Sequence, residues 1–402
     1  MHRRLALAAA IVCGIALGWA APAAQAPAPS TLGERISAAL DEWVTQTQYP
    51  GAALGVYRPI PRVEGGVSGS LYSSGVSRRG GGTTCVGGNC QSDAPSRIGV
   101  DDLMLAGSTG KTFFAAVAVQ MIEAGQLDLD APISTYLGSR PWFARLPNAR
   151  DITVRHLMTH TSGLVRYEMN PKFTADLRAQ PDKVWTPEEE IAYLLDAPPP
   201  FAAGKGWDYS DTNYIVLGMI MEQITGTRLY DEVRRRFLEP LKLTRIVPST
   251  SRRIAALIPG YAGPRDPLGL PDEVLQNGIF VINPQFEWTG GGFATSAFDL
   301  AHWGHELYAG KALSAKARAL MIDNAVPAQL GPNTKYGLGV IIRETPVGTI
   351  WGHSGFFPGY QTELIHVVGT GTTIALQVNS SAPRPPGTRS PLRFALDLAA
   401  LK

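Results

Sequence analysis

The chain has 402 residues, 45% of them hydrophobic and 17% charged, so it carries enough apolar side chains to bury one large core or two smaller ones. This composition excludes a disordered chain, and 43 glycines with 31 prolines indicate a loop-rich globular protein. Its 36 basic and 34 acidic side chains are evenly mixed, which argues against a partner bound through phosphates, so we expect no nucleic-acid partner.

Residues 1–26 have the pattern of a secretory signal peptide. Arg3 and Arg4 precede the apolar run Leu5–Leu17, and small residues follow around positions 23–26. The run is shorter than the ~20 residues of a membrane-spanning helix, and no other long uncharged apolar stretch follows. We therefore expect a periplasmic or secreted protein without a stable membrane span. Cys13 is not preceded by small residues, which disfavours a lipid anchor.

Two cysteines remain after the leader, Cys85 and Cys90, in a Gly-rich stretch. An oxidising compartment favours a local disulfide between them, and closing so short a loop contributes about 2 kcal/mol or less. Two thiols without a nearby histidine do not make a metal site. His156 and His160 have a metal-like spacing, but Leu157 stands where a zinc protease carries Glu. We interpret both histidines as structural and expect no metal.

The first part of the chain reads as a helix over residues 32–47, followed by a strand over 51–57. Residues 59–97 are rich in Gly, Ser and turns around strand-like pieces such as 70–76, and we interpret them as a long surface excursion. The run Thr112–Ala124 is apolar on almost every side. A helix of that kind belongs in the middle of a protein.

Helical patterns dominate the next part of the chain and strands the last. Three helices are predicted to begin at Pro187, at Asp211 (to Ile224) and at Leu229 (to Leu238), and a fourth runs from about 296 to Tyr308. The Pro/Gly-rich loop Gly260–Asp272 is expected to border the substrate cleft. Short β-rich segments then predict an antiparallel meander over 336–343, 349–353, 361–368 and 372–379, before a closing helix at 390–401.

These elements predict an α/β fold in which helices flank an antiparallel sheet. Residues 31–130 and 290–402 would form the α/β domain, and residues 131–289 a mainly helical inserted domain.

The most informative chemistry lies at the head of the buried helix, in Ser108-Thr109-Gly110-Lys111. A spacing of three places Ser108 and Lys111 on one helical face, about 5–6 Å apart. Lys111 can take the serine proton only if it is neutral, which requires its pKa to fall by about 3 units through burial. The amino end of the helix would in turn stabilise an oxyanion near Ser108.

A phosphate-binding loop is the competing interpretation of Gly110-Lys111-Thr112. That motif requires a glycine five positions before Gly110, where Leu105 stands. Export would also remove the nucleotide, so this alternative is disfavoured.

Three motifs in order, Ser108–Lys111, Tyr209-Ser210-Asp211 and His353-Ser354-Gly355, resemble the active-site elements of the penicillin-recognising serine hydrolases. That family includes class C β-lactamases, DD-carboxypeptidases, D-aminopeptidases and carboxylesterases, and the resemblance implies its β-lactamase/transpeptidase-like fold. It extends from about residue 32 to 379 and includes three further stretches, at 125–130, 152–164 and 290–295.

The resemblance implies a role for each catalytic residue. Ser108 would attack a carbonyl and carry the acyl group, with Lys111 as its proton acceptor. Tyr209 would relay protons to the leaving group, which requires positive charges that lower the pKa of its phenol.

It also implies how the third motif acts. The backbone N–H groups of Ser108 and of Phe356, which follows Gly355, would form the oxyanion hole. His353 would line the opposite wall, where it binds a substrate carboxylate or holds the tyrosine and serine protons in place.

The sequence departs from the family pattern at two positions. Asp211 stands where Asn is usual and can only accept hydrogen bonds when ionised, which bears on substrate binding. It can pair with Lys111 and favour the charged form of the lysine, unless Asn213 turns in or Asp211 only caps the following helix, and we expect capping. His353 stands where most class C β-lactamases have Lys, which points toward the peptidase and esterase branches.

The sequence therefore predicts an exported serine hydrolase that works through a Ser108 acyl-enzyme on a D-amino-acid peptide or a small carboxylic ester. No cofactor is implied, and the partner is a small-molecule or peptide substrate. The alternatives are a β-lactamase, or a non-catalytic relative that binds a peptidoglycan peptide or a protein.

Overall fold

The computed structural model describes residues 31–60, 63, 66–79, 82–86, 89–93 and 97–401. The expected signal peptide at 1–26 and Cys13 lie outside the described residues. None of the described helices is both long and apolar enough to cross a membrane.

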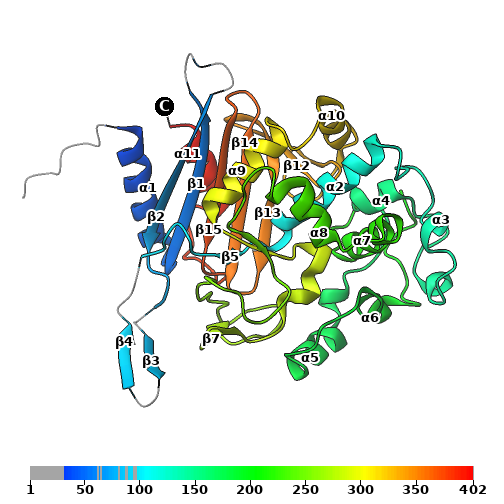
Figure 1. Cartoon of the computed structure of the whole chain (residues 1–402), viewed down its shortest axis with the longest axis horizontal. Coiled ribbons are helices and arrows are strands. Elements are labelled where there is room, and N and C mark those ends of the chain that lie inside the picture. The colour runs from blue at the N-terminus through cyan, green and yellow to red at the C-terminus, as the bar shows by residue number, and fades with distance from the viewer. Residues whose placement is uncertain are drawn as a thin grey trace, which may run out of the picture.

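A large antiparallel sheet forms the frame of the molecule (Figure 1). Its order is β10-β11-β12-β13-β14-β15-β1-β2, so strands from the two ends of the chain meet where β15 pairs with β1. The strands of this sheet are β1 (Gly51–Pro59), β2 (Val67–Gly75), β10 (Val326–Pro327), β11 (Thr334–Tyr336), β12 (Ile341–Thr345), β13 (Gly348–Phe357), β14 (Tyr360–Val367) and β15 (Thr372–Val378).

Helices cover both faces of the sheet (Figure 1). α1 and α11 pack on one face, and α9 packs on the other against β1, β14 and β15. The described α-helices are α1 (Leu32–Thr47), α2 (Lys111–Glu123), α3 (Ser134–Leu137), α4 (Val154–Met158), α5 (Pro171–Ala179), α6 (Pro187–Ile191), α7 (Thr212–Thr225), α8 (Leu229–Val233), α9 (Ala297–Tyr308), α10 (Ala315–Asp323) and α11 (Pro391–Ala399).

Alternation along the strands separates two cores. On β1, Leu54 and Val56 join the cluster under α1 and α11, whereas Ala53 and Tyr57 face the larger cluster on the opposite side. Successive side chains of a strand point to opposite faces, so this nearly continuous apolar strand contributes side chains to the cores on both faces of the sheet. The expected mixed α/β fold with a flanked antiparallel sheet is confirmed.

The apolar run at 112–124 is the buried central helix α2. Its side chains from Phe113 to Val119 are 0% exposed, and the helix contacts α7, α8 and α10. A short 3-10 turn, η1 (Gly107–Gly110), leads into it and carries Ser108.

The structure corrects three of the elements that were predicted from the sequence. Residues 59–97 are not only a surface excursion, because β2 pairs along its whole length with β1 as the edge strand of the main sheet. The expected strand at 336–343 is two strands, β11 and β12, and Gly339 between them has φ +79. The expected helix at 229–238 changes after Val233 into a π-helical turn. The division into an α/β domain and an inserted helical domain stays a prediction.

The two cysteines lie on a separate hairpin, β3 (Gly82–Val86) with β4 (Asn89–Asp93), whose register sets Cys85 opposite Cys90. The disulfide itself stays a prediction.

Candidate active site

Ser108 and Lys111 come together at the start of α2, as the sequence predicts. Lys111 Nζ lies 3.0 Å from Ser108 Oγ, and the lysine side chain is fully buried. Gly110 lets the neighbouring Gly290–Gly292 segment approach, because a Cβ on Gly110 would lie 1.6 Å from the carbonyl oxygen of Gly291. The carbonyl of Gly290 accepts a hydrogen bond from Lys111 Nζ.

Lys111 is charged rather than neutral. Its ammonium forms an ion pair with Asp211 Oδ1. Burial acts to lower the pKa of Lys111. The charge of Asp211 and the neighbouring Tyr209 raise it by more, so the net pKa lies above its ordinary value. The expectation of an uncharged amine at this position is therefore wrong for this structure.

Asp211 stands at the N-cap of α7, yet its side chain makes no cap hydrogen bond. The expectation of capping is wrong because the carboxylate turns to Lys111 instead. Asn213 does not turn in either, since its amide bonds Ser162 and His160. Asp211 is therefore paired with the ammonium of α2, and its side chain accepts no hydrogen bond from the first N–H groups of α7.

Two further charged residues, not predicted from the sequence, complete this cluster. Arg166 Nη2 lies 3.9 Å from Asp211 Oδ2, and Arg166 Nε donates to Glu168 Oε1 at 2.5 Å. Burial acts to raise the pKa of Asp211, but Lys111 and Arg166 hold it below its ordinary value. Glu168 differs, because burial raises its pKa to about 7.

Tyr209 lies beside this cluster, with Lys111 Nζ 5.1 Å from the centre of its ring. Its hydroxyl is buried and makes no hydrogen bond of good geometry to any described residue. Burial raises the pKa of the phenol, and Lys111 and Ser108 only partly offset this effect. The net shift is upward, opposite to the expected one, so Tyr209 is a protonated phenol at neutral pH.

His353 is 2% exposed, and both its ring nitrogens are engaged. Nδ1 lies 2.7 Å from the carbonyl oxygen of Ser354, and Nε2 lies 2.9 Å from the hydroxyl of Tyr336. Because a carbonyl only accepts, we assign the proton to Nδ1, so that Tyr336 donates to Nε2. Burial, followed by the charge of Lys111, lowers the pKa of His353 to about 3. In this arrangement the ring is neutral and is not free to bind a substrate carboxylate.

The backbone of Phe356 lies next to the serine turn. A Cβ on Gly107 would lie 2.7 Å from the nitrogen of Phe356, so the two segments are in direct contact. In the β13–β14 hairpin Phe357 faces Tyr360 across a two-residue loop, which makes the next pair, Phe356 with Gln361, a non-hydrogen-bonded one. The N–H of Phe356 therefore points away from β14, toward Gly107. Gly355 also requires its small size there, because a Cβ would lie 2.0 Å from the carbonyl oxygen of Ala106.

A narrow cleft of about 60 Å³ opens over this cluster. Phe356 and Pro267 line it together with Asp211. Part of the 260–272 loop therefore borders this cleft, and that substrate binds in it stays a prediction. The other residues that line this cleft include Arg166, Glu168, Met169, Leu268, Phe286 and Glu287.

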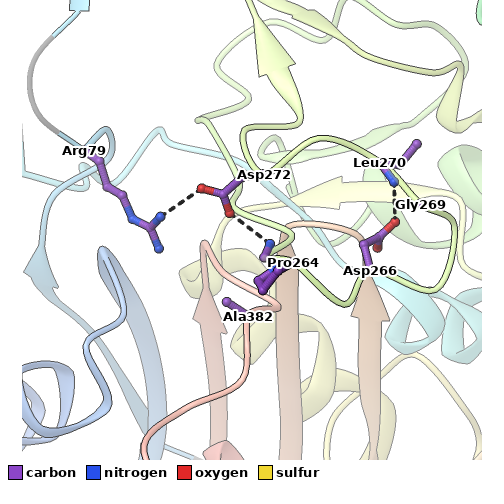
Figure 2. A pocket seen from close by; sticks show the side chains of 8 residues that line it. Arg79, Pro264, Asp266, Gly269, Leu270, Asp272 and Ala382 are labelled. Carbon is purple, nitrogen blue, oxygen red and sulfur yellow. Dashed lines mark hydrogen bonds and ion pairs between the residues drawn. The ribbon is translucent and has the colours of Figure 1, made fainter.

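The other side of the same loop lines a larger pocket of about 580 Å³ (Figure 2). There Arg79 Nη1 donates to Asp272 Oδ2 at 3.1 Å, and Asp266 accepts from the backbone N–H groups of Leu268 and Leu270. Its lining contains none of the predicted site residues, so we place the chemistry in the smaller cleft.

The histidines with metal-like spacing have separate contacts. His156 accepts at Nδ1 from the backbone N–H of Thr153 as part of a capping box. His160 accepts at Nδ1 from Ser210 N–H, and its ring packs 4.3 Å from that of Tyr209. Both contacts agree with the structural interpretation, and His160 supports the tyrosine.

Comparison with known proteins identifies relatives of this chain. The family model described as Beta-lactamase matches residues 36–398. Penicillin-binding protein 4 of Amycolatopsis lactamdurans is 30% identical over 50% of this chain and 45% of its own length. Esterase EstB of Burkholderia gladioli is 30% identical over 43% of this chain and 45% of its own length. The match thus spans about half the length of these curated relatives.

Solved structures match over more of the chain. A D-stereospecific amidohydrolase from Streptomyces sp. has 26% identity and a TM-score of 0.69, over 87% of this chain and 95% of its own. The D-amino acid amidase from Ochrobactrum anthropi SV3, complexed with D-phenylalanine, has 24% identity and a TM-score of 0.73, over 92% of this chain and 98% of its own. At that identity the second likeness shows the fold alone.

Proposed function

The chain belongs to the β-lactamase family of serine hydrolases, and we propose that it hydrolyses an amide of a D-amino acid or a small carboxylic ester through an acyl-enzyme on Ser108. The observation that carries this proposal is the 3.0 Å approach of Lys111 Nζ to Ser108 Oγ at the head of a buried helix. Nucleophile and proton-transfer partner are then already within reach of each other.

Each neighbour has a task in this reaction. Ser108 attacks the substrate carbonyl, and the N–H groups of Ser108 and Phe356 bind the oxygen on which negative charge develops. Tyr209 keeps its proton at neutral pH, so its role is to donate that proton to the leaving group.

The substrate class follows from the wall formed by the third motif. His353 is buried and neutral, so this wall offers no cation for the carboxylate of a β-lactam. Esters and amides do not require that anchor, and the likeness to EstB and to the D-stereospecific amidohydrolase supports the same choice. The leader-like residues 1–26 support action in the periplasm or outside the cell.

Covalent labelling tests the nucleophile. Intact mass after treatment with a fluorophosphonate should rise by one adduct in the wild type and stay unchanged in Ser108→Ala. Ser74→Ala is the matched control, because it removes a serine hydroxyl outside the proposed site. Ser74 lies on β2 and donates to Asp41 of α1. Labelling that persists in Ser108→Ala would place the nucleophile elsewhere.

A substrate panel tests the class. Turnover of p-nitrophenyl butyrate or of D-alanine p-nitroanilide should exceed that of a chromogenic cephalosporin. Faster turnover of the cephalosporin would overturn the assignment made from His353.

A further inference from the structure

The three hydrogen-bond donors of Lys111 are all in use. Its ammonium faces Ser108 Oγ at 3.0 Å, the carboxylate of Asp211 and the carbonyl oxygen of Gly290. An ammonium has three N–H bonds and no lone pair. Lys111 therefore cannot take the proton of Ser108 unless it gives up one of its own.

Asp211 is the acceptor suited to receive that proton. The carbonyl of Gly290 is not a base, and Ser108 is the group that must lose its proton. We infer, on the basis of the proposed acyl-enzyme function, that Asp211 is the terminal proton acceptor in acylation and is reached from Ser108 through Lys111. An asparagine, the residue usual at this position in the family that the sequence resembles, cannot take a proton.

The step balances in atoms and electrons. The Oγ–H bond of Ser108 breaks as a new N–H bond forms on Lys111, and another N–H bond of Lys111 breaks as an O–H bond forms on Asp211. The freed electron pair on Oγ bonds the substrate carbonyl carbon, and the C=O π pair moves onto the carbonyl oxygen. Lys111 is an ammonium before and after, and Asp211 becomes a neutral acid. When the acyl group later leaves Ser108, the proton returns from Asp211 through Lys111 to Oγ.

The surroundings keep Asp211 ionised, so it carries no proton before the relay begins. Lys111 and Arg166 lie on two sides of it, while Glu168 is held by Arg166. The other titratable groups that act on Asp211 come from several elements, namely Glu287, Tyr167, Tyr209, Tyr336, His160 and His353. Asp211 is thus the carboxylate that contacts Lys111 and has a cation on either side.

The pH dependence of Asp211→Asn tests the relay. With p-nitrophenyl butyrate, whose leaving group needs no proton, kcat/KM at pH 7 should fall by about 100-fold or more, the usual contribution of a general base. The loss should recover as pH rises, because neutral Lys111 must then act as the base. The acidic limb should therefore move up by more than about one pH unit relative to wild type. Asp211→Glu should restore part of the activity at pH 7.

The matched control is Asp299→Asn, which removes another mostly buried carboxylate at the start of a helix, α9, and should leave the pH profile unchanged. An Asp211→Asn variant with wild-type or higher kcat/KM and an unmoved acidic limb would overturn the relay. Fluorophosphonate labelling of Ser108 in the wild type would still stand in that case, so the proposed function would survive.

A proton inventory on the wild type avoids any risk that a variant misfolds. In mixtures of H₂O and D₂O, kcat/KM for the same ester should curve quadratically, because two protons move in one step. A linear dependence would mean that one proton moves, and the relay through Asp211 would be refuted.

Discussion

Gly110→Ala tests whether the close approach between the serine turn and the Gly290–Gly292 segment sets the geometry of the site. The added methyl group would lie 1.6 Å from the carbonyl oxygen of Gly291, whereas ordinary contact begins at 3.4 Å. One backbone segment must therefore move by about 3.4 − 1.6 = 1.8 Å. Both segments hold functional groups, since Ser108 lies on one and the carbonyl of Gly290, which binds Lys111, on the other.

The expected effects on stability and rate differ in size. Overpacking of this kind costs about 1–3 kcal/mol of unfolding free energy, or roughly 1–4 °C in Tm for a chain of this size. A displacement of about 1 Å in catalytic groups can cost 100-fold in rate, so kcat/KM for p-nitrophenyl butyrate should fall by at least about that factor. Thermal melting and ester hydrolysis measure the two effects on the same sample.

The matched control is Gly369→Ala, where a methyl group would meet no atom within 4 Å. This variant should stay within about 0.5 kcal/mol of wild type and keep its activity. If Gly110→Ala melted and reacted as Gly369→Ala does, the close approach would not determine the position of Ser108 relative to Lys111.

Three further outcomes follow from buried groups. Trp43 stacks on Phe394 with ring centres 4.5 Å apart, so Trp43→Ala should cost about 3–5 kcal/mol in denaturant unfolding, and a loss under about 1 kcal/mol would contradict this role. Glu190 is 1% exposed and burial raises its pKa, so the native state keeps a proton that the unfolded chain releases above pH 4.5, and stability falls as pH rises. Glu190→Gln should remove that slope, which is at most about 1.4 kcal/mol per pH unit, and an equal slope in both proteins would count against it. With a pKa of about 3, His353 should keep its Nδ1–H tautomer in ¹⁵N NMR from about pH 8 to about pH 5, so a titration near pH 6.5 would refute its neutral assignment.

The sequence was sufficient for features that depend on local pattern. The helix at 32–47 was predicted with its observed bounds, because the capping box of Thr31 with Glu34 and the apolar spacing are encoded within a few residues. The pairing of Ser108 with Lys111 is equally local, since a spacing of three at a helix start fixes it. Arg166 and Glu168 carried no such signal, because the loop before α5 reaches the site only through the tertiary fold.

Asp211 shows most clearly why charge states require the fold. A carboxylate one residue before a helix can accept hydrogen bonds from either of two kinds of donor. One is the set of free N–H groups in the first turn of its own helix, and the other is a lysine 100 residues away in the sequence. The choice depends on where α2 lies relative to α7, and Gly110 contributes by letting the start of α2 touch the Gly290–Gly292 segment, which packs beside Asp211. The same packing buries Lys111 beside Asp211, so one non-local contact sets both the position of the amine and its charge. A motif can therefore predict which residues meet in this site, but the direction in which the proton of Ser108 travels depends on which acceptor the fold places beside Lys111.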